Sequence, residues 1–172
     1  MIRKLRKVSM IWKFLFWPIV WIFIFIPSLI LPLSLHGIWM LISRIIGILL
    51  LIYSLFLSSS GGRVLARFAH RETHETFWPD KFTDFGIFGC MRHSMHFGLA
   101  LFPVAIALIS GLVLAICSAG WGVAGALWFV IQIEEKDALE KFGQLYSDYM
   151  LKVPPFSLNP TCLKEAFKIW RT

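Results

Sequence analysis

The fold is decided by Ile131-Gln-Ile-Glu-Glu-Lys-Asp-Ala-Leu-Glu-Lys-Phe-Gly-Gln-Leu-Tyr-Ser-Asp-Tyr-Met-Leu-Lys-Val-Pro-Pro155, where a long apolar run turns into a charged helix. No Asp, Glu, Lys or Arg occurs from His93 to Ile133, so Glu134 and Glu135 are the first carboxylates after that run. A carboxylate at the edge of the hydrocarbon is costly unless it is solvated, paired or used by a ligand. Two in succession therefore indicate a site at the membrane interface.

The composition places the chain among integral membrane proteins. Of its 172 residues, 58% are hydrophobic and only 16% are charged, whereas a soluble domain is nearer half apolar. The net charge of +7 would suggest a nucleic-acid partner in a soluble protein. Because no basic stripe is interleaved with exposed aromatic residues, we expect no nucleic acid, and we assign the charge to topology and anionic lipid headgroups.

Apolar segments long enough for membrane helices, with Gly and Ser clusters between them, predict an all-α, polytopic membrane protein. Ser58-Ser-Ser-Gly-Gly62 is predicted to end the second helix, and Ser118-Ala-Gly-Trp-Gly122 to form a hairpin. The whole chain, 1–172, is expected to be a single membrane-embedded domain with a connection at 59–95 and a helical tail at 134–172. About four transmembrane helices follow, over residues 12–31, 38–58, 96–117 and 121–133.

The predicted fourth span is short. About 13 residues of helix cover roughly 20 Å, against a hydrocarbon core of about 30 Å. Glu134 and Glu135 are therefore expected at or below the headgroups, in a polar cavity. Beyond them the helix leaves the membrane with one apolar face and ends at Val153-Pro-Pro155; that face carries Leu139, Phe142, Tyr146 and Tyr149.

The distribution of Lys and Arg predicts the orientation. The N-terminal segment and the connection at 59–95 are basic, whereas the loops at 32–37 and 118–122 contain no Lys or Arg. Positive residues favour the cytosolic side, so both termini are expected to be cytosolic. Arg44, inside the second span, is expected to extend its charge toward the near membrane surface.

The cysteines and histidines form no specific metal-binding motif. Cys90, Cys117 and Cys162 are odd in number and widely spaced, so no disulfide framework is expected and Cys90 is interpreted as a bystander thiol. His70 with His74, and His93 with His96, have spacings that can bind a metal. A membrane metal enzyme, such as a non-haem iron oxidase, remains an alternative, although five histidines are few for an iron pair.

Two groups of opposite charge are expected at the same membrane face. Arg92 and His93 stand at the mouth of the third span, after a glycine-containing loop, and both can donate hydrogen bonds to an anion. By themselves they could equally anchor a helix to phosphate headgroups. Together with Glu134 and Glu135 they offer both signs of charge, as a zwitterionic cofactor such as S-adenosylmethionine requires.

The order of these motifs resembles the isoprenylcysteine carboxyl methyltransferase and phospholipid methyltransferase superfamily of integral membrane enzymes, over about residues 83–160. The resemblance rests on Arg92-His93, Gly98, a tight apolar hairpin, Glu134-Glu135, Phe142-Gly143, Tyr146, Tyr149 and Val153-Pro154. It implies a cytosol-facing S-adenosylmethionine pocket and a lipophilic substrate that enters sideways among the helices. It makes Arg92, His93, Gly98, Glu134 and Glu135 cofactor-binding residues, with Tyr146 and Tyr149 as lid or substrate residues.

The chain departs from the pattern of that superfamily at three positions. Ser94 stands where a proline usually follows Arg-His, and Gly86-Ile-Phe-Gly89 replaces a Gly-Pro-Tyr/Phe-Arg lead-in. Val130 stands where an arginine often precedes the Glu pair by four residues. Such an arginine could serve a carboxylate acceptor, so its replacement bears on the type of substrate.

The expected function is methyl transfer from S-adenosylmethionine to a prenylcysteine carboxylate, a lipid amine or a small hydrophobic nucleophile. Glu135 is assigned as the catalytic residue because a partly buried carboxylate can take the proton of an amine acceptor. Two alternatives stay open. One is a non-catalytic small membrane protein whose charged groups are structural ties, and the other is a membrane metal or NADPH oxidoreductase.

Overall fold

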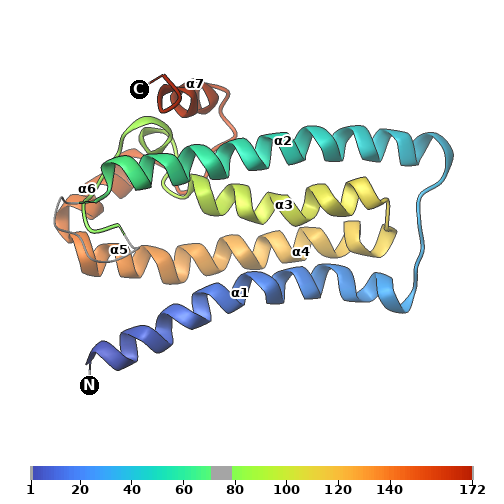
Figure 1. The fold of residues 1–172 in the computed structure, drawn as a ribbon, viewed down its shortest axis with the longest axis horizontal. Coiled ribbons are helices and arrows are strands. Elements are labelled where there is room, and N and C mark those ends of the chain that lie inside the picture. The colour runs from blue at the N-terminus through green and yellow to red at the C-terminus, as the bar shows by residue number, and fades with distance from the viewer. Residues whose placement is uncertain (1, 71–78, 172) are drawn as a thin grey trace. The chain divides into compact units, whose positions relative to one another are not determined.

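The computed structural model describes residues 2–70 and 79–171, with side chains from residue 12, and this part of the chain is helical without named strands (Figure 1). The all-α class is confirmed for these residues, and three helices are long and apolar enough to cross a bilayer. The helix at Ser94–Ser110 is apolar but has only 17 residues, about 26 Å. The three candidate spans are Trp12–Ile30, Gly37–Phe68 and Val113–Phe142.

The helices fall into two compact units, one of Met1–Leu51 with Ala100–Ala126 and the other of Ile52–Leu99 with Leu127–Thr172. The boundary falls inside α2, α3 and α4, so each unit draws on both halves of the chain. In chain order the elements are α1 (Ile2–Ile30), α2 (Gly37–Phe68), the 3₁₀ helix η1 (Gly86–Gly89), α3 (Ser94–Ser110), α4 (Val113–Phe129), the π-helical turn η2 (Val130–Glu134), α5 (Glu135–Phe142), α6 (Gln144–Lys152) and α7 (Thr161–Lys168).

In the first unit, the turn between α3 and α4 lies at Gly111, and the predicted hairpin at 118–122 is wrong. Gly111 adopts φ +69°, a left-handed conformation that glycine takes without strain. The turn is tied to the loop before α2, because Leu35 N–H donates to the Gly111 carbonyl (2.8 Å) and Val113 N–H to the Leu33 carbonyl (2.9 Å). The helix from Val113 to Phe142 therefore has 30 residues, roughly 45 Å, and the inference of a short fourth span is also wrong.

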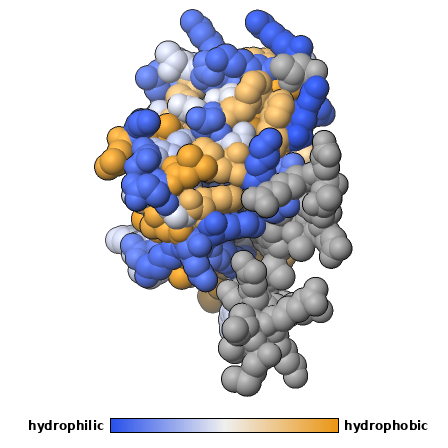
Figure 2. Space-filling model, turned by 90° about the vertical axis from the view of Figure 1, so that its left-hand side faces the viewer, coloured by the Kyte–Doolittle hydropathy of each residue, from blue (hydrophilic) through white to orange (hydrophobic). Residues whose placement is uncertain are grey.

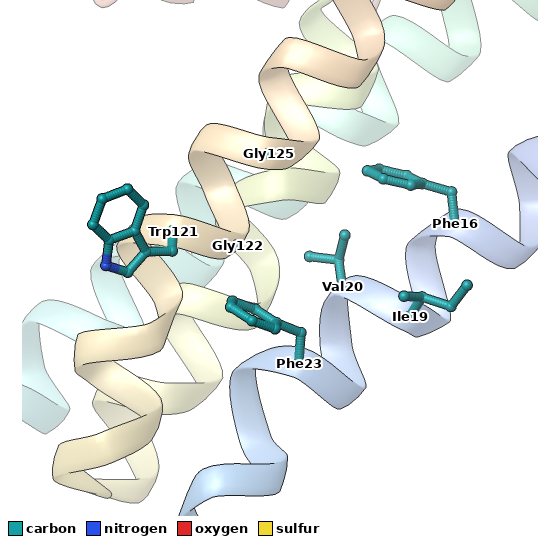
Figure 3. A pocket seen from close by; sticks show the side chains of 7 residues that line it. All are labelled: Phe16, Ile19, Val20, Phe23, Trp121, Gly122 and Gly125. Atoms are coloured by element: carbon teal, nitrogen blue, oxygen red, sulfur yellow. The ribbon is translucent and has the colours of Figure 1, made fainter.

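The small residues of the supposed hairpin lie inside α4, where they let it approach α1. An ideal Cβ on Gly122 would lie 2.6 Å from Ile24 Cδ1, whereas one on Gly125 would meet nothing within 4 Å. Small residues promote such close helix contacts in membranes. Figure 3 shows the apolar groove of about 280 Å³ that results, into which α1 points aromatic and branched side chains; its lining residues are Phe16, Ile19, Val20, Phe23, Trp121, Gly122 and Gly125.

In the second unit, α2 continues to Phe68 instead of ending at 58–62, so that boundary was predicted wrongly. The reason is packing against α3. Ser54 Oγ donates to the Gly98 carbonyl (2.7 Å) and Ser58 Oγ to the Met95 carbonyl (3.3 Å). Serine hydroxyls and glycines on this helix face replace bulky side chains, which keeps the helix intact and joins it closely to its neighbour.

The charged end of the second unit begins where α4 continues through η2 into α5. Gly143, at φ +56°, ends α5 and separates it from α6, so the predicted continuous helix is in fact two. The end of α6 before Val153 and the helix in the tail are confirmed. Seen from the end where α5 and α6 lie, the surface carries many hydrophilic side chains among apolar ones (Figure 2).

Candidate functional site

The second unit contains a buried charged cluster of Arg92, His93 and Glu135. Arg92 donates from Nε (3.1 Å) and Nη2 (2.6 Å) to Glu135 Oε1, and His93 Nε2 lies 3.1 Å from the same oxygen. All three side chains are 7–8% exposed. Arg92 and His93 immediately precede α3, while Glu135 begins α5 directly after η2. A π-helical turn shifts the register of the residues after it, and such turns are frequent at functional sites.

Arg92 also holds the segment that follows α6. Its Nη1 donates to the carbonyls of Met150 (2.9 Å) and Val153 (2.6 Å). The backbone N–H groups of Arg92 and His93 donate to the carbonyls of Pro154 (3.0 Å) and Pro155 (3.1 Å). Four of the five N–H donors of the guanidinium are thus used inside the protein. Arg92 therefore positions Glu135 and the C-terminal segment.

Glu135 keeps one oxygen for a ligand. Its three hydrogen bonds all fall on Oε1, and within the described residues no hydrogen bond reaches Oε2. A carboxylate oxygen can accept about two hydrogen bonds, so Oε2 is able to accept a proton or an ammonium N–H. With Oε1 fixed by a guanidinium and an imidazole, the direction of Oε2 is fixed as well.

Two tyrosines of α6 close one side of the cluster. Tyr146 and Tyr149 are 6% and 8% exposed, and the hydroxyl of Tyr149 donates to the Phe88 carbonyl of η1. Burial raises the pKa of Tyr146 to about 12, and the negative charge of Glu135 adds to the rise. Burial, and secondarily Tyr146, raises the pKa of Tyr149. At neutral pH both side chains are therefore neutral phenols, which donate hydrogen bonds and do not act as bases.

Of the residues expected at the site, the structure brings together Arg92, His93 and Glu135, with Tyr146 and Tyr149 beside them. Glu134 is half-buried in the last position of η2, one residue before the cluster. Gly98 is buried against α2, where an ideal Cβ would lie 2.3 Å from Ser58 Oγ and 2.6 Å from the Ser54 carbonyl. Close packing of α3 on α2 thus explains why glycine occupies position 98. Cofactor binding by Gly98 and Glu134 stays a prediction.

We expect Gly98→Ala to lower the melting temperature by about 3–10 °C, because overpacking of about 1–3 kcal/mol shifts Tm by a few degrees per kcal/mol. Thermal unfolding in detergent measures this. Gly120→Ala is the matched control, since a Cβ there meets nothing within 4 Å. An unchanged Tm combined with lost cofactor binding would show that Gly98 serves the cofactor and not the packing.

The sequence reasoning missed a disulfide. Cys90 and Cys162 are joined, with their Cα atoms 5.4 Å apart, so the interpretation of Cys90 as a bystander thiol is wrong. Nothing local could reveal the pair, because 72 residues separate the two cysteines and three cysteines allow three pairings. Cys117 lies on the exposed side of α4. Phe156 was missed too; its ring centroid is 5.9 Å from His93 and 5.6 Å from Phe97.

The histidine pairs form no recognisable metal centre in the described part of the chain. The rings of His93 and His96 are 6.1 Å apart and meet edge to face. His70 Nδ1 lies 3.8 Å from Asp80 Oδ1, while His74 is outside the described residues. Among residues 2–70 and 79–171, no group of three or more His, Cys, Asp or Glu side chains is placed to hold a metal ion.

No family model, curated protein or solved structure matches this chain. The class of protein is therefore defined by the fold and the site alone. It is a helical protein with three helices long and apolar enough to span a membrane, and it carries a buried arginine–histidine–glutamate cluster.

Proposed function

We propose that this chain transfers the methyl group of S-adenosylmethionine to a lipophilic or membrane-borne acceptor, as a multi-pass protein with both termini and the site on the cytosolic side. The observation that carries the proposal is the convergence of Arg92, His93 and Glu135. Two segments that lie 42 residues apart in sequence meet in one buried cluster. These residues, with Tyr146 and Tyr149, are among those on which the resemblance to the membrane methyltransferase superfamily rests.

The chemistry of the cluster fits the cofactor. The amino-acid end of S-adenosylmethionine carries an ammonium and a carboxylate, and its sulfonium supplies an electrophilic methyl group. Glu135 Oε2 can accept an ammonium N–H, while the second ring nitrogen of His93, Nδ1, can serve a carboxylate. Burial of the cluster strengthens each of these contacts relative to water.

The residues of the chain then have distinct tasks. Arg92 and His93 hold Glu135 Oε1, so one lone pair of Oε2 can bind the ammonium and the other can take the proton that an amine acceptor must lose before it attacks. A carboxylate acceptor is already ionised at neutral pH and needs no base. The buried phenols of Tyr146 and Tyr149 exclude water from this side of the cluster. Methyl transfer depends mainly on alignment in a dry site, which such an arrangement favours.

One observation supports a second reading, in which the chain is a non-catalytic membrane protein. Arg92 gives four of its donors to protein acceptors, as a purely structural tie would. This reading predicts no methyl transfer and no cofactor binding.

The proposal is tested with membranes that contain the protein and S-adenosylmethionine labelled in its methyl group. We expect label to accumulate in the organic extract with time, and not in membranes that lack the protein. Addition of a prenylcysteine or of a phospholipid with a primary amine separates the acceptor classes. If no lipid-soluble or added acceptor gains label, the enzymatic proposal fails and the structural reading stands.

A further inference from the structure

The Cys90–Cys162 disulfide lies next to the charged cluster in the second unit. Cys90 follows η1 directly and precedes Arg92 by two residues, and Cys162 is in the first turn of α7. Cys90 is half-buried, whereas Cys162 is 1% exposed. The disulfide therefore ties α7 to the loop that supplies two of the three cluster residues, and Cys90 offers the more accessible sulfur.

Beyond the disulfide, α7 packs closely on η1, where an ideal Cβ on Gly86 would lie 3.2 Å from the Glu165 carbonyl, and it makes further contacts at its other end. Trp170 Nε1 donates to Ser60 Oγ (3.0 Å), and the guanidinium carbon of Arg63 lies 3.9 Å from the Trp170 ring centroid. Phe167 packs on Phe56, with centroids 4.6 Å apart. The disulfide adds to this packing a covalent link between the first turn of α7 and the loop that follows η1.

The disulfide also acts on the cluster through the segment before α7. Pro154 and Pro155 accept hydrogen bonds from the backbone of Arg92 and His93, and Phe156 packs on the His93 ring. The chain then reaches Cys162, which returns by the disulfide to Cys90. The backbone from Pro154 to Cys162, the disulfide, and the hydrogen bonds from Arg92 and His93 thus form a closed ring. Opening the disulfide removes the covalent cross-link of this ring.

The predicted orientation makes this disulfide unusual. The distribution of Lys and Arg predicts that the loop and the tail face the cytosol, where the glutathione and thioredoxin systems keep most thiols reduced. Cytosolic disulfides are mostly transient and serve catalysis or redox sensing. A bond that links the site loop to the C-terminal helix α7 has the placement that such sensing requires.

We propose that Cys90–Cys162 is a thiol–disulfide exchange site through which a cellular dithiol reductant regulates the cluster, a role that rests on the proposed function. A thiolate of the reductant attacks Cys90 Sγ, the S–S bond breaks, and Cys162 leaves as a thiolate that takes up a proton. The second thiol of the reductant then attacks the mixed disulfide, releasing Cys90 as a thiol and leaving the reductant as a disulfide. Two electrons and two protons pass to the protein.

The oxidised protein is the binding-competent form, because the cross-link fixes the loop and the segment that position Arg92 and His93. We expect reduction to weaken binding of S-adenosylhomocysteine, the demethylated cofactor, at least about tenfold, and to expose α7 to trypsin at Lys164, Lys168 and Arg171. The Cys90→Ser variant should behave as the permanently reduced form.

The experiment uses the full chain carrying Cys117→Ser, which leaves only the pair in question, equilibrated with glutathione mixtures from fully reduced to fully oxidised. Thiol alkylation counts the reduced fraction, limited trypsinolysis follows α7, and calorimetry follows S-adenosylhomocysteine. We expect a reversible transition within the glutathione range, with faster cleavage of α7 on reduction. A pair that stays oxidised or reduced throughout, or equal cleavage of both forms, would overturn the exchange site.

Failure of the proposed function is distinguishable from failure of the regulation. If neither form binds S-adenosylhomocysteine while thiol titration and cleavage change together, the methyltransferase proposal fails and the exchange site stands. If both forms bind equally well, the methyltransferase proposal stands and the regulation is overturned.

Discussion

Glu135→Gln is expected to lower the rate of methyl transfer to an amine acceptor at least about 100-fold, the range that loss of a general base commonly costs. The amide keeps the size of the side chain and one oxygen for Arg92 and His93, but it cannot take up the proton of the acceptor. Its NH₂ group replaces the free Oε2. Because both an amide NH₂ and an ammonium only donate hydrogen bonds, the ammonium of the cofactor loses its acceptor. Labelled-methyl incorporation at saturating cofactor measures the rate.

Glu140→Gln is the matched control, because Glu140 is an exposed carboxylate on the same helix, α5. It removes the same charge from the same element, and it should leave the rate within about twofold if only the cluster matters. A carboxylate acceptor needs no base, so with that substrate Glu135→Gln should act on cofactor affinity more than on turnover. Equal effects of the two substitutions would contradict the role of Glu135.

Arg92→Ala is expected to have the largest effect on stability. It leaves the Glu135 carboxylate buried with His93 as its remaining partner, and it deprives the carbonyls of Met150 and Val153 of a donor. Removing one partner of a buried ion pair typically costs about 3–5 kcal/mol. We therefore expect Tm in detergent to fall by roughly 10 °C or more, or the protein not to accumulate in the membrane.

Arg92→Lys keeps the charge but not the planar fork, so it cannot reach Glu135 and both carbonyls together and should lie between wild type and Arg92→Ala. The double substitution Arg92→Ala, Glu135→Ala removes both charges. It should be less destabilising than the sum of the two single substitutions, because no unpaired charge is left behind. Additive effects would show that the two side chains do not stabilise each other.

The helices and the cluster residues could be predicted to different extents. Long apolar runs determine where membrane helices lie, so the predicted end of the first span at residue 31 agrees with the end of α1 at Ile30. The ends of helices were predicted from Ser and Gly clusters, and here the reasoning failed at 58–62 and at 118–122. In water such clusters favour turns, but between membrane helices they permit close contact, as Gly122 and Gly61 show.

Glu135 was singled out for a reason that the structure corrects. The sequence suggested that a short fourth span drew the Glu pair below the headgroups, but the helix is 30 residues long. Glu135 is buried instead because Arg92 and His93 come from the loop before α3 to meet it. Charge complementarity, and the resemblance to the methyltransferase superfamily, predicted that meeting. The disulfide, and the tie between Arg92 and the carbonyl groups after α6, depend on contacts between distant segments that no local pattern encodes.

The most direct test of the proposed cofactor site is calorimetric titration of S-adenosylhomocysteine into the purified, detergent-solubilised protein, beside the His93→Ala and Glu140→Gln variants. We predict a Kd in the micromolar range, about −8 kcal/mol, for the wild type and for Glu140→Gln, and at least about tenfold weaker binding by His93→Ala, since charge-assisted contacts are worth about 1.5–3 kcal/mol. Absence of any binding by a well-folded wild-type protein would contradict the assignment of the Arg92–His93–Glu135 cluster as an S-adenosylmethionine site.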